Sequence, residues 1–474
     1  MHPLPTNELC KIPRRLQMIP HRREETEKRV QSGEWLVTSI DLHPRFSQHR
    51  PMFKLLIGVS LLLVTFAVAE EDKSPVLIFT KFRLTEQFWS EGAAAADFNQ
   101  DGKVDLVYGP FWFAGPDFAK RTEYRPAIAN FKRKAQNDSQ ETIPGFEGAL
   151  GVNNAYSDCF LMFTHDFNND RWPDILVIGF PGRETFWYEN PQKQNAPWKQ
   201  HLVLAIVDNE SPGFTDVTGD GKPELVCCSE GFIGYAEADW KQPSAPWKFH
   251  AASPKGDYQR FTHGLGAGDI NGDGRVDLLE KSGWWEQPKK PGDGRPWQKH
   301  EFNFGSGGAQ MFAYDVNGDG RNDVITSLEA HGYGVAWFEQ FHKEGTISFR
   351  QHLIVGRNPQ DTRYGTAFSQ PHALDLADVD GDGLKDLVTG KRFWAHGPAG
   401  DPEPNAAAVL YWFQLKRDGK GGAEFVPHLV DEDSGVGTQV TVARVSQKKN
   451  PDIIVGNKKG LFLFRNQAPK ASRP

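Results

Sequence analysis

The stretch Asp269-Ile-Asn-Gly-Asp-Gly-Arg-Val-Asp277, followed by the apolar pair Leu278-Leu279, decides the fold because variants of it recur along the chain. A seventh copy, residues 444–452, keeps the apolar run but has lost the acidic positions before Asp452. Successive copies lie between 46 residues (Asp269 to Asp315) and 69 residues (Asp97 to Asp166) apart, which predicts a repeat fold. The other copies begin at Asp97, Asp166, Asp216, Asp315 and Asp378.

Four short apolar runs, typical of β-strands, can be assigned to most repeats. One precedes the acidic stretch, one follows it, a third is aromatic, as in Trp284-Trp285, and a fourth ends in histidine. Four strands in a repeat of this length form a propeller blade. The sequence therefore predicts an all-β fold, a seven-bladed β-propeller of four-stranded blades over residues 75–467. The histidines recur in five repeats and are expected to be structural: His201, His250, His300, His352 and His428.

The last blade is expected to be closed by the N-terminal strand. The seventh repeat ends near Phe464 without a fourth strand of its own, whereas residues 79–84 resemble a fourth strand but precede the first acidic stretch. Pairing the two completes the blade and covers an edge that would otherwise invite aggregation.

Composition narrows the classes of function. The net charge is -7 and no basic stripe stands out, so a nucleic-acid partner is not expected. Apart from Cys10, the cysteines are Cys159, Cys227 and Cys228, too few for a disulfide framework, and they are expected to be buried free thiols.

The N-terminal segment predicts export. Lys54 precedes an apolar run that ends in Ala67-Val68-Ala69, the form of a signal peptide over residues 52–69, and the run is too short for a confident membrane span. Residues 1–51 are expected to be a mis-assigned start or a disordered extension, and residues 468–474 a disordered tail. The mature protein is then secreted or periplasmic, with no stable membrane span after signal cleavage.

The acidic stretches are predicted to bind up to six Ca²⁺ ions. Side-chain oxygens at positions 1, 3, 5 and 9 and the carbonyl of position 7 form a hard oxygen set, and glycine at position 6 permits the turn. Arg171 occupies position 6 of the second stretch, at a cost of about 1–2 kcal/mol. An acidic turn without metal is the alternative. The expected ligands are Asp97, Asn99, Asp101, Lys103, Asp105, Asp166, Asn168, Asp170, Trp172, Asp174, Asp216, Thr218, Asp220, Lys222, Glu224, Asp269, Asn271, Asp273, Arg275, Asp277, Asp315, Asn317, Asp319, Arg321, Asp323, Asp378, Asp380, Asp382, Leu384 and Asp386.

The pattern D-x-N-x-D-G-x-x-D-L followed by apolar residues resembles the FG-GAP/VCBS repeat of integrin α-chain propellers. The resemblance extends over about residues 75–467. It implies that calcium lies in the loop between the first and second strands of each blade, on one face of the propeller, and stabilises the blade. Fold alone does not fix function.

A polar ring is expected on the opposite face. Counting back six residues from the first Asp of each stretch gives Glu91, Glu210, His263 and His372, together with Phe160 and Ala309, and eight residues back adds Asp158 and Asp208. Gln310, Gln370 and Gln439 lie nearby. Histidines and carboxylates suit one further divalent metal, Zn²⁺, Mn²⁺ or Mg²⁺, on the propeller axis. A solvent-filled polar channel is the alternative. The expected axial ligands are Glu91, Asp158, Glu210, His263 and His372.

Loops on the same face supply cations, imidazoles and aromatic rings, which suit a sugar or uronate. The predicted ligand is therefore a carbohydrate or a small polar molecule. The expected ligand-binding residues are Arg183, Glu230, Lys281, Tyr333, Trp394 and His396.

The segments RFTHGLGAGD (260–269), NESPGFTD (209–216) and GWWEQP (283–288) are similar to the propeller part of aldos-2-ulose dehydratase, a metal-dependent lyase. That family adds cupin domains, for which this chain has no room. The resemblance implies β-elimination: a metal on His263, His372 and Glu210 polarises a carbonyl, His331 takes the α-proton, and Lys391 or Arg392 steadies the enolate.

Three functions stay open. The first is a binding propeller for a carbohydrate or for an envelope or extracellular protein partner. The second is a metal-dependent sugar lyase or dehydratase. The third is a structural adhesion or interaction module.

Overall fold

The computed structural model describes residues 77–128, 130–134, 139–144, 156–194 and 196–467. They form thirty strands and one 3₁₀ helix, Pro359–Asp361, so the predicted all-β class is confirmed. None of the described helical residues forms a segment long and apolar enough to cross a membrane. The predicted extension (1–51), signal peptide (52–69) and tail (468–474) lie outside the described residues.

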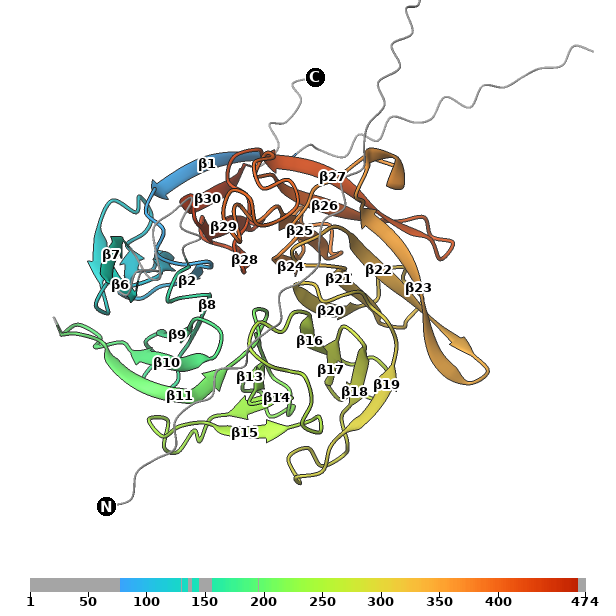
Figure 1. Cartoon of the computed structure of the whole chain (residues 1–474), viewed down its shortest axis with the longest axis horizontal. Helices are drawn as coiled ribbons and strands as arrows, with labels where there is room; N and C mark the ends of the chain where they lie inside the picture. The colour runs from blue at the N-terminus through green and yellow to red at the C-terminus, as the bar shows by residue number, and fades with distance from the viewer. Residues whose placement is uncertain (1–76, 129, 135–138, 145–155, 195, 468–474) are drawn as a thin grey trace, which may run out of the picture. The chain divides into compact units, whose positions relative to one another are not determined.

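Antiparallel four-stranded meanders stand around a common centre in a propeller-like arrangement (Figure 1). Three of the separate sheets are β2 (Ala94–Ala96), β3 (Asp105–Tyr108), β4 (Phe111–Phe113) and β5 (Arg121–Glu123); β8 (Leu161–His165), β9 (Asp174–Ile178), β10 (Arg183–Glu189) and β11 (Lys199–Val207); and β12 (Gly213–Thr215), β13 (Glu224–Ser229), β14 (Phe232–Glu237) and β15 (Lys248–Ala251). A fourth sheet is β24 (Leu374–Ala377), β25 (Asp386–Gly390), β26 (Leu410–Arg417) and β27 (Ala423–Asp431).

The N-terminal strand closes the last of the separate sheets, as predicted. β1 (Ile78–Thr85) pairs antiparallel with β30 (Gly460–Gln467) from Ile78 opposite Gln467 to Thr85 opposite Leu461. β30 continues into β29 (Asp452–Asn457) and β28 (Val440–Ala443). The two ends of the described chain thus lie side by side in one sheet (Figure 1).

Two meanders share one eight-stranded sheet, which the sequence did not predict. The innermost strands β16 and β20 pair in parallel, from Leu265 opposite Gln310 to Ala267 opposite Phe312. Glycines allow the contact: a Cβ on Gly266 would lie 2.0 Å from the Met311 carbonyl oxygen. The strands are β16 (Leu265–Gly268), β17 (Asp277–Glu280), β18 (Gly283–Glu286), β19 (Gln298–Glu301), β20 (Gln310–Tyr314), β21 (Asp323–Ser327), β22 (Val335–Lys343) and β23 (Thr346–Val355).

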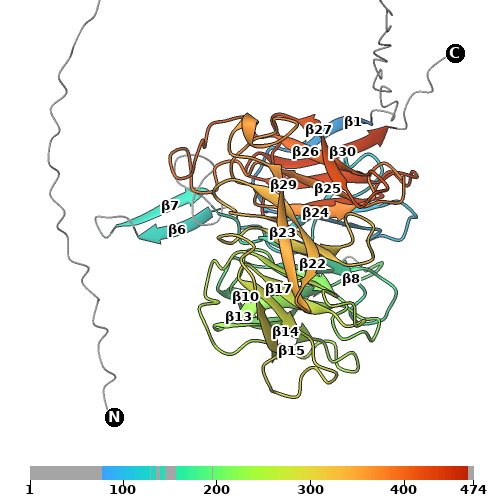
Figure 2. The ribbon, with the colours of Figure 1, turned by 90° about the vertical axis from the view of Figure 1, so that its right-hand side faces the viewer.

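A hairpin outside the meanders was also not predicted. β6 (Asn130–Lys134) pairs with β7 (Gln140–Pro144) and with no other described strand. Figure 2 shows it extending away from the blades. It follows β5 in a stretch without the repeat pattern, so the repeat could not reveal it.

The recurring histidines are structural. His201 stacks on Trp187 with 4.2 Å between ring centroids, and its Nε2 lies 2.8 Å from Glu189 Oε2. His300 on Trp284 and His352 on Trp337 repeat the arrangement. Cys159, Cys227 and Cys228 are buried free thiols, as predicted. Cys227 packs with Trp187 and Cys228 with Trp285, so these neighbours face two different core clusters.

Each acidic stretch connects the innermost strand of a meander to the second. In most of them the ninth residue ties the loop to the third strand: Asp277 Oδ2 accepts the N–H of Ile270 and Oδ1 that of Gln287, both at 2.9 Å. Asp105, Asp174, Asp323 and Asp386 make the same two bonds. We call this arrangement the carboxylate tie. Asp452 makes it too, with Ser446 and Asn466, which explains why the seventh copy keeps this residue alone. Among the described residues, Glu224 bonds only within its own loop, to the N–H groups of Val217 and Thr218.

Two positions of each loop adopt the left-handed conformation. Position 6 does so in the second loop, where Arg171 has φ 73°, as at the glycines that fill this position elsewhere. Position 4 does so as well, at φ 54° for Gln100 and 57° for Asn169. The sequence analysis identified only position 6, although glycine also fills position 4 in four loops.

Arg171→Gly is predicted to raise the free energy of unfolding by roughly 1 kcal/mol, because glycine relieves the left-handed strain. Urea denaturation measures the change. Lys103→Gly is the matched control, since Lys103 is also a loop cation but is not among the positive-φ residues. This control should be neutral or destabilising. A destabilised Arg171→Gly protein would contradict the strain assignment.

Candidate functional site

The site lies at the end of the innermost strands opposite the acidic loops. His263 and His372 stand two residues before β16 and β24, and Glu210 stands three before β12. The site residues precede the innermost strands and the acidic loops follow them, so the two groups lie at opposite ends of these strands.

Four side chains converge at this end, and we call them the polar centre: Glu210, His263, His331 and His372. Each offers one ligand atom, and these atoms lie within 4.8 Å of one another. The Nε2 atoms of His263 and His372 are 3.2 Å apart. Glu210 Oε1 lies 3.7 Å from His263 Nε2, and its Oε2 lies 3.3 Å from His372 Nε2. Three of these residues come from the predicted ring, whereas His331 was expected only as a base on the rim.

The protonation states of His263, His372 and Glu210 allow the centre to bind a cation. Burial lowers the pKa of His263 to about 4 and holds that of His372 well below its usual value, so both imidazoles are neutral near pH 7. Burial alone would raise the pKa of Glu210. The His372 hydrogen bond and the charges of His263 and Arg392 nevertheless keep it well below its usual value. Neutral imidazoles beside an ionised carboxylate form a donor set that fits a divalent metal.

Arg392 is part of the centre rather than of the rim. Its guanidinium is 1% exposed and lies 3.1 Å from Glu91 Oε1 and 3.3 Å from Glu210 Oε2. Nη1 also lies 2.9 Å from His372 Nε2. Glu91 and Glu210 therefore both face Arg392, and the buried Lys458 interacts with Glu91 and Arg392 as well.

Two residues expected on the axis are engaged elsewhere. Glu91 faces Arg392, and Asp158 pairs with Arg125 at 2.7 Å. Neither belongs to the group of converging ligand atoms. Counting back along the repeat fixes which end of a strand a residue occupies, but not which arginine reaches it from another loop.

Buried polar atoms around the centre lack partners among the described residues. They include His372 Nδ1 and Asn209 Nδ2. Buried polar groups in native proteins are usually satisfied. A polar ligand or an ordered water fits this surrounding better than an apolar one does.

Asp401 is a site residue that the sequence analysis missed. Its Oδ1 lies 2.9 Å from His396 Nδ1 and 3.6 Å from His331 Nδ1. Burial raises its pKa, but His331 and His396 together hold it below the usual range. A carboxylate on one imidazole nitrogen orients the ring for a ligand on the other. Asp401 lies in an unrepeated loop, so only its closeness to His396 in sequence could have drawn attention to it.

The predicted rim residues separate into two groups. Lys281 lines a pocket of about 380 Å³ together with His263 and His331. The others do not line that pocket. Lys391 is buried and donates to Ser369 Oγ at 2.6 Å, and Trp394 Nε1 donates to Asn405 at 3.0 Å. Four more belong to this group: Tyr333, which lies 5.1 Å below Arg357, the exposed Arg183 and Glu230, and His396, which pairs with Asp401.

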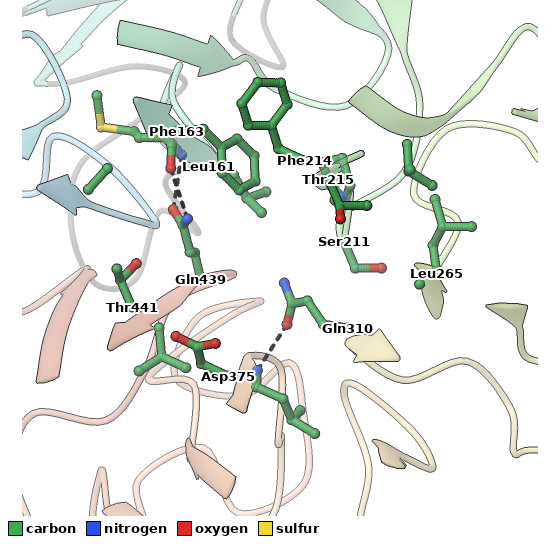
Figure 3. A pocket seen from close by; sticks show the side chains of 18 of the residues that line it. Leu161, Phe163, Ser211, Phe214, Thr215, Leu265, Gln310, Asp375, Gln439 and Thr441 are labelled. Atoms are coloured by element: carbon green, nitrogen blue, oxygen red, sulfur yellow. Dashed lines mark hydrogen bonds between the residues drawn. The ribbon is translucent and has the colours of Figure 1, made fainter. Parts of the chain in front are cut away.

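The innermost strands line a channel of about 460 Å³ (Figure 3). Gln439 spans part of it, because its amide bonds both the N–H and the carbonyl of Met162 at 2.9 Å. Gln310 Oε1 accepts the Leu374 N–H at 2.9 Å. Asp375 Oδ2 accepts the Val442 N–H at 2.7 Å, and burial raises the pKa of Asp375 to about 6. These polar residues join strands, so the channel is a structural element.

The acidic loops offer clustered oxygens at the other end. Asp378, Asp380 and Asp386 each place an oxygen within 4.8 Å of the others, and so do Asp216, Asp220 and Glu224. This donor set fits Ca²⁺. In two loops the arginine at position 7 pairs with the position-5 carboxylate, Arg275 with Asp273 and Arg321 with Asp319. Those two loops therefore already hold a cationic group.

Comparison with known proteins supports the repeat pattern. Residues 166–227 match the model of the FG-GAP-like repeat. Integrin alpha-PS3 of Drosophila melanogaster is 33% identical over 98 residues, which is 19% of this chain and 8% of the integrin. The chain thus corresponds to a small part of that relative.

Solved structures show more distant likenesses. An Agrocybe aegerita lectin, described as recognising non-reducing terminal N-acetylglucosamine, has 16% identity and a TM-score of 0.39, over 72% of this chain and 88% of the lectin. BBS1N in complex with ARL6DN has 11% identity and a TM-score of 0.45, over 84% and 99%. Both TM-scores are too low to carry an argument about function.

Arg392→Gln is predicted to lower the free energy of unfolding by about 3–5 kcal/mol, because it leaves two buried carboxylates without their cation. Urea denaturation measures the loss. Arg295→Gln is the control, since Arg295 forms an exposed pair with Asp293, and it should leave stability unchanged. Equal stability of the two variants would show that Arg392 does not neutralise the centre.

Proposed function

We propose that this chain, which belongs to the FG-GAP-repeat β-propellers, is an exported, calcium-stabilised module that binds a carbohydrate or related polar ligand at a metal-containing centre. The family supports an interaction module. The observation that carries the finer proposal is the convergence of Glu210, His263, His331 and His372 beside a polar pocket. An envelope or extracellular protein is the alternative partner.

Seven blades and up to six Ca²⁺ ions belong to this proposal. Five separate four-stranded sheets and the two meanders of the eight-stranded sheet support the blade count. The clustered loop oxygens support calcium, and a cation would also offset the raised pKa of the ninth residue. Burial, opposed by backbone hydrogen bonds but reinforced by Asp380, raises the pKa of Asp386 to about 8. Export to the periplasm or the medium rests on residues 52–69.

The polar centre favours Zn²⁺ or Mn²⁺ over Mg²⁺. Three imidazoles and one carboxylate are nitrogen-rich, whereas Mg²⁺ prefers oxygen ligands and water. His263 and His372 would hold the ion with Glu210. His331, whose Nδ1 lies 3.6 Å from Asp401 Oδ1, would complete the set. Glu91 and Asp158 are left out of the ligand set because arginines engage them.

A metal-dependent sugar lyase or dehydratase is the second candidate, favoured because His263 and His331 line the pocket. A bound divalent metal supplies Lewis-acid chemistry. His331, which lines the pocket, is the side chain suited to accept a proton from a ligand there. Arg392 and Lys391 are buried, so in this candidate they set the charge of the centre rather than contact substrate.

Calcium removal by EGTA is predicted to lower the melting temperature, because a ligand that binds only the folded state stabilises it by mass action. Calorimetry measures the melting temperature, and elemental analysis measures the calcium content. Asp382→Ala should lower the calcium content by about one ion per chain. Asp418→Ala is the matched control, since Asp418 caps the turn between β26 and β27, outside the acidic loops, and it should keep the full content. An unchanged melting temperature in EGTA would rule out structural calcium.

The purified protein is predicted to carry about one transition metal per chain, separate from calcium. His263→Ala and Glu210→Gln should each lose it and retain calcium, since both remove a ligand of the centre. His352→Ala, which removes a structural histidine, is the control and should keep the metal. Elemental analysis decides the matter. Equal metal content in His263→Ala and His352→Ala would contradict the assignment.

A further inference from the structure

We infer that the pocket beside the polar centre is an acidic-sugar subsite, in which Arg260 and Lys281 bind the carboxylate of a uronate whose ring lies against Phe261. The inference rests on the proposed function, because it names the ligand class of the same site. Arg260 and Phe261 were not among the residues predicted from the sequence.

Among the residues that the structure describes, aromatic rings rather than a paired carboxylate hold Arg260. Its Cζ lies 4.6 Å from the ring centroids of both Phe180 and Phe261, so two aromatic rings fix the guanidinium. Gly182 leaves room for its stem, since a Cβ there would lie 3.0 Å from Arg260 Cδ. The charge of Arg260 acts to lower the pKa of Asp208, which burial raises. The Asp208 Oδ2 atom, however, accepts the backbone N–H of Glu230. The two rings stand at 80° to each other, so they do not sandwich the guanidinium. Contacts with aromatic rings leave guanidinium N–H groups for a bidentate carboxylate.

Phe261 is exposed by a strained backbone. Its side chain is 40% exposed and its φ is 68°, a left-handed conformation that is strained for a non-glycine residue. The backbone N–H donates to the Asp208 carbonyl at 2.8 Å, which holds the turn. An aromatic ring kept at the edge of a polar pocket offers a flat apolar face. The apolar face of a sugar ring matches it.

Lys281 supplies a second cation, on the side of the pocket that is lined by His263 and His331. Gly307 lies between Lys281 and His263: a Cβ there would lie 3.2 Å from His263 Cβ and 3.4 Å from Lys281 Cδ. Among the described residues no carboxylate pairs with Lys281. The pocket of about 380 Å³ is large enough for a small ligand.

The remaining charges favour a monocarboxylate with many hydroxyls. Asp257 and Glu329 also line the pocket, so two cations face two anions. Carboxylates accept hydrogen bonds from hydroxyl groups and repel multiply charged anions such as phosphate esters. A uronate carries one negative charge and several hydroxyls, which meets both conditions.

Calorimetric titration of the full chain with D-galacturonate and D-glucuronate, against D-galactose and D-glucose, tests the subsite. At least one uronate should bind more tightly than its neutral counterpart. Arg260→Gln should weaken uronate binding by about tenfold or more and leave neutral-sugar binding unchanged. Phe261→Gly keeps the backbone conformation and should weaken acidic and neutral sugars alike. Arg295→Gln is the control and should change neither.

Two results would overturn the subsite: no preference for either uronate over its neutral counterpart, or uronate binding by Arg260→Gln equal to that of the unaltered chain. Metal content measured on the same samples separates this inference from the proposed function. If the protein contains the metal but shows no preference for a uronate, the subsite is contradicted and the metal centre is not. Uronate preference that depends on Arg260 in metal-free protein would support the subsite and sink the metal centre.

Discussion

The carboxylate tie is the interaction on which the rest of the structure depends. One buried side chain accepts an N–H from its own loop and another from the chain after the third strand, as Asp277 does with Ile270 and Gln287. A buried acceptor must be satisfied, so the two bonds hold loop and strand in one register. Asp452 keeps the tie in a copy that has lost every other acidic position. The tie is thus separable from the other acidic positions of the loop.

This register fixes the far end of each innermost strand as well. Because the loop end is held, His263 and His372, two positions before β16 and β24, arrive at one place, where Glu210 meets them from the start of β12. His331 and Arg392 reach the same place from other loops. A repeated scaffold therefore presents an unrepeated set of charged and imidazole groups.

The repeat made the scaffold predictable, but not the partners of its side chains. Strand number per repeat, closure by β1, loop position and the structural histidines all follow from spacing and alternation. The merging of two meanders depends on how closely Gly266 lets β20 approach, which spacing does not encode. At the site, counting back identified Glu210, His263 and His372. The roles of Asp401 and Arg260 and the ion pair of Glu91 with Arg392 were not identified, because these residues lie in loops that share no pattern between repeats.

Crystallographic anomalous scattering from the mature protein, collected at the absorption edges of zinc and manganese, tests the central claim most directly. The account predicts one transition-metal peak bounded by Glu210, His263, His331 and His372, with none in the acidic loops. Water alone at that position, with His263 and His372 hydrogen-bonded to each other, would contradict it.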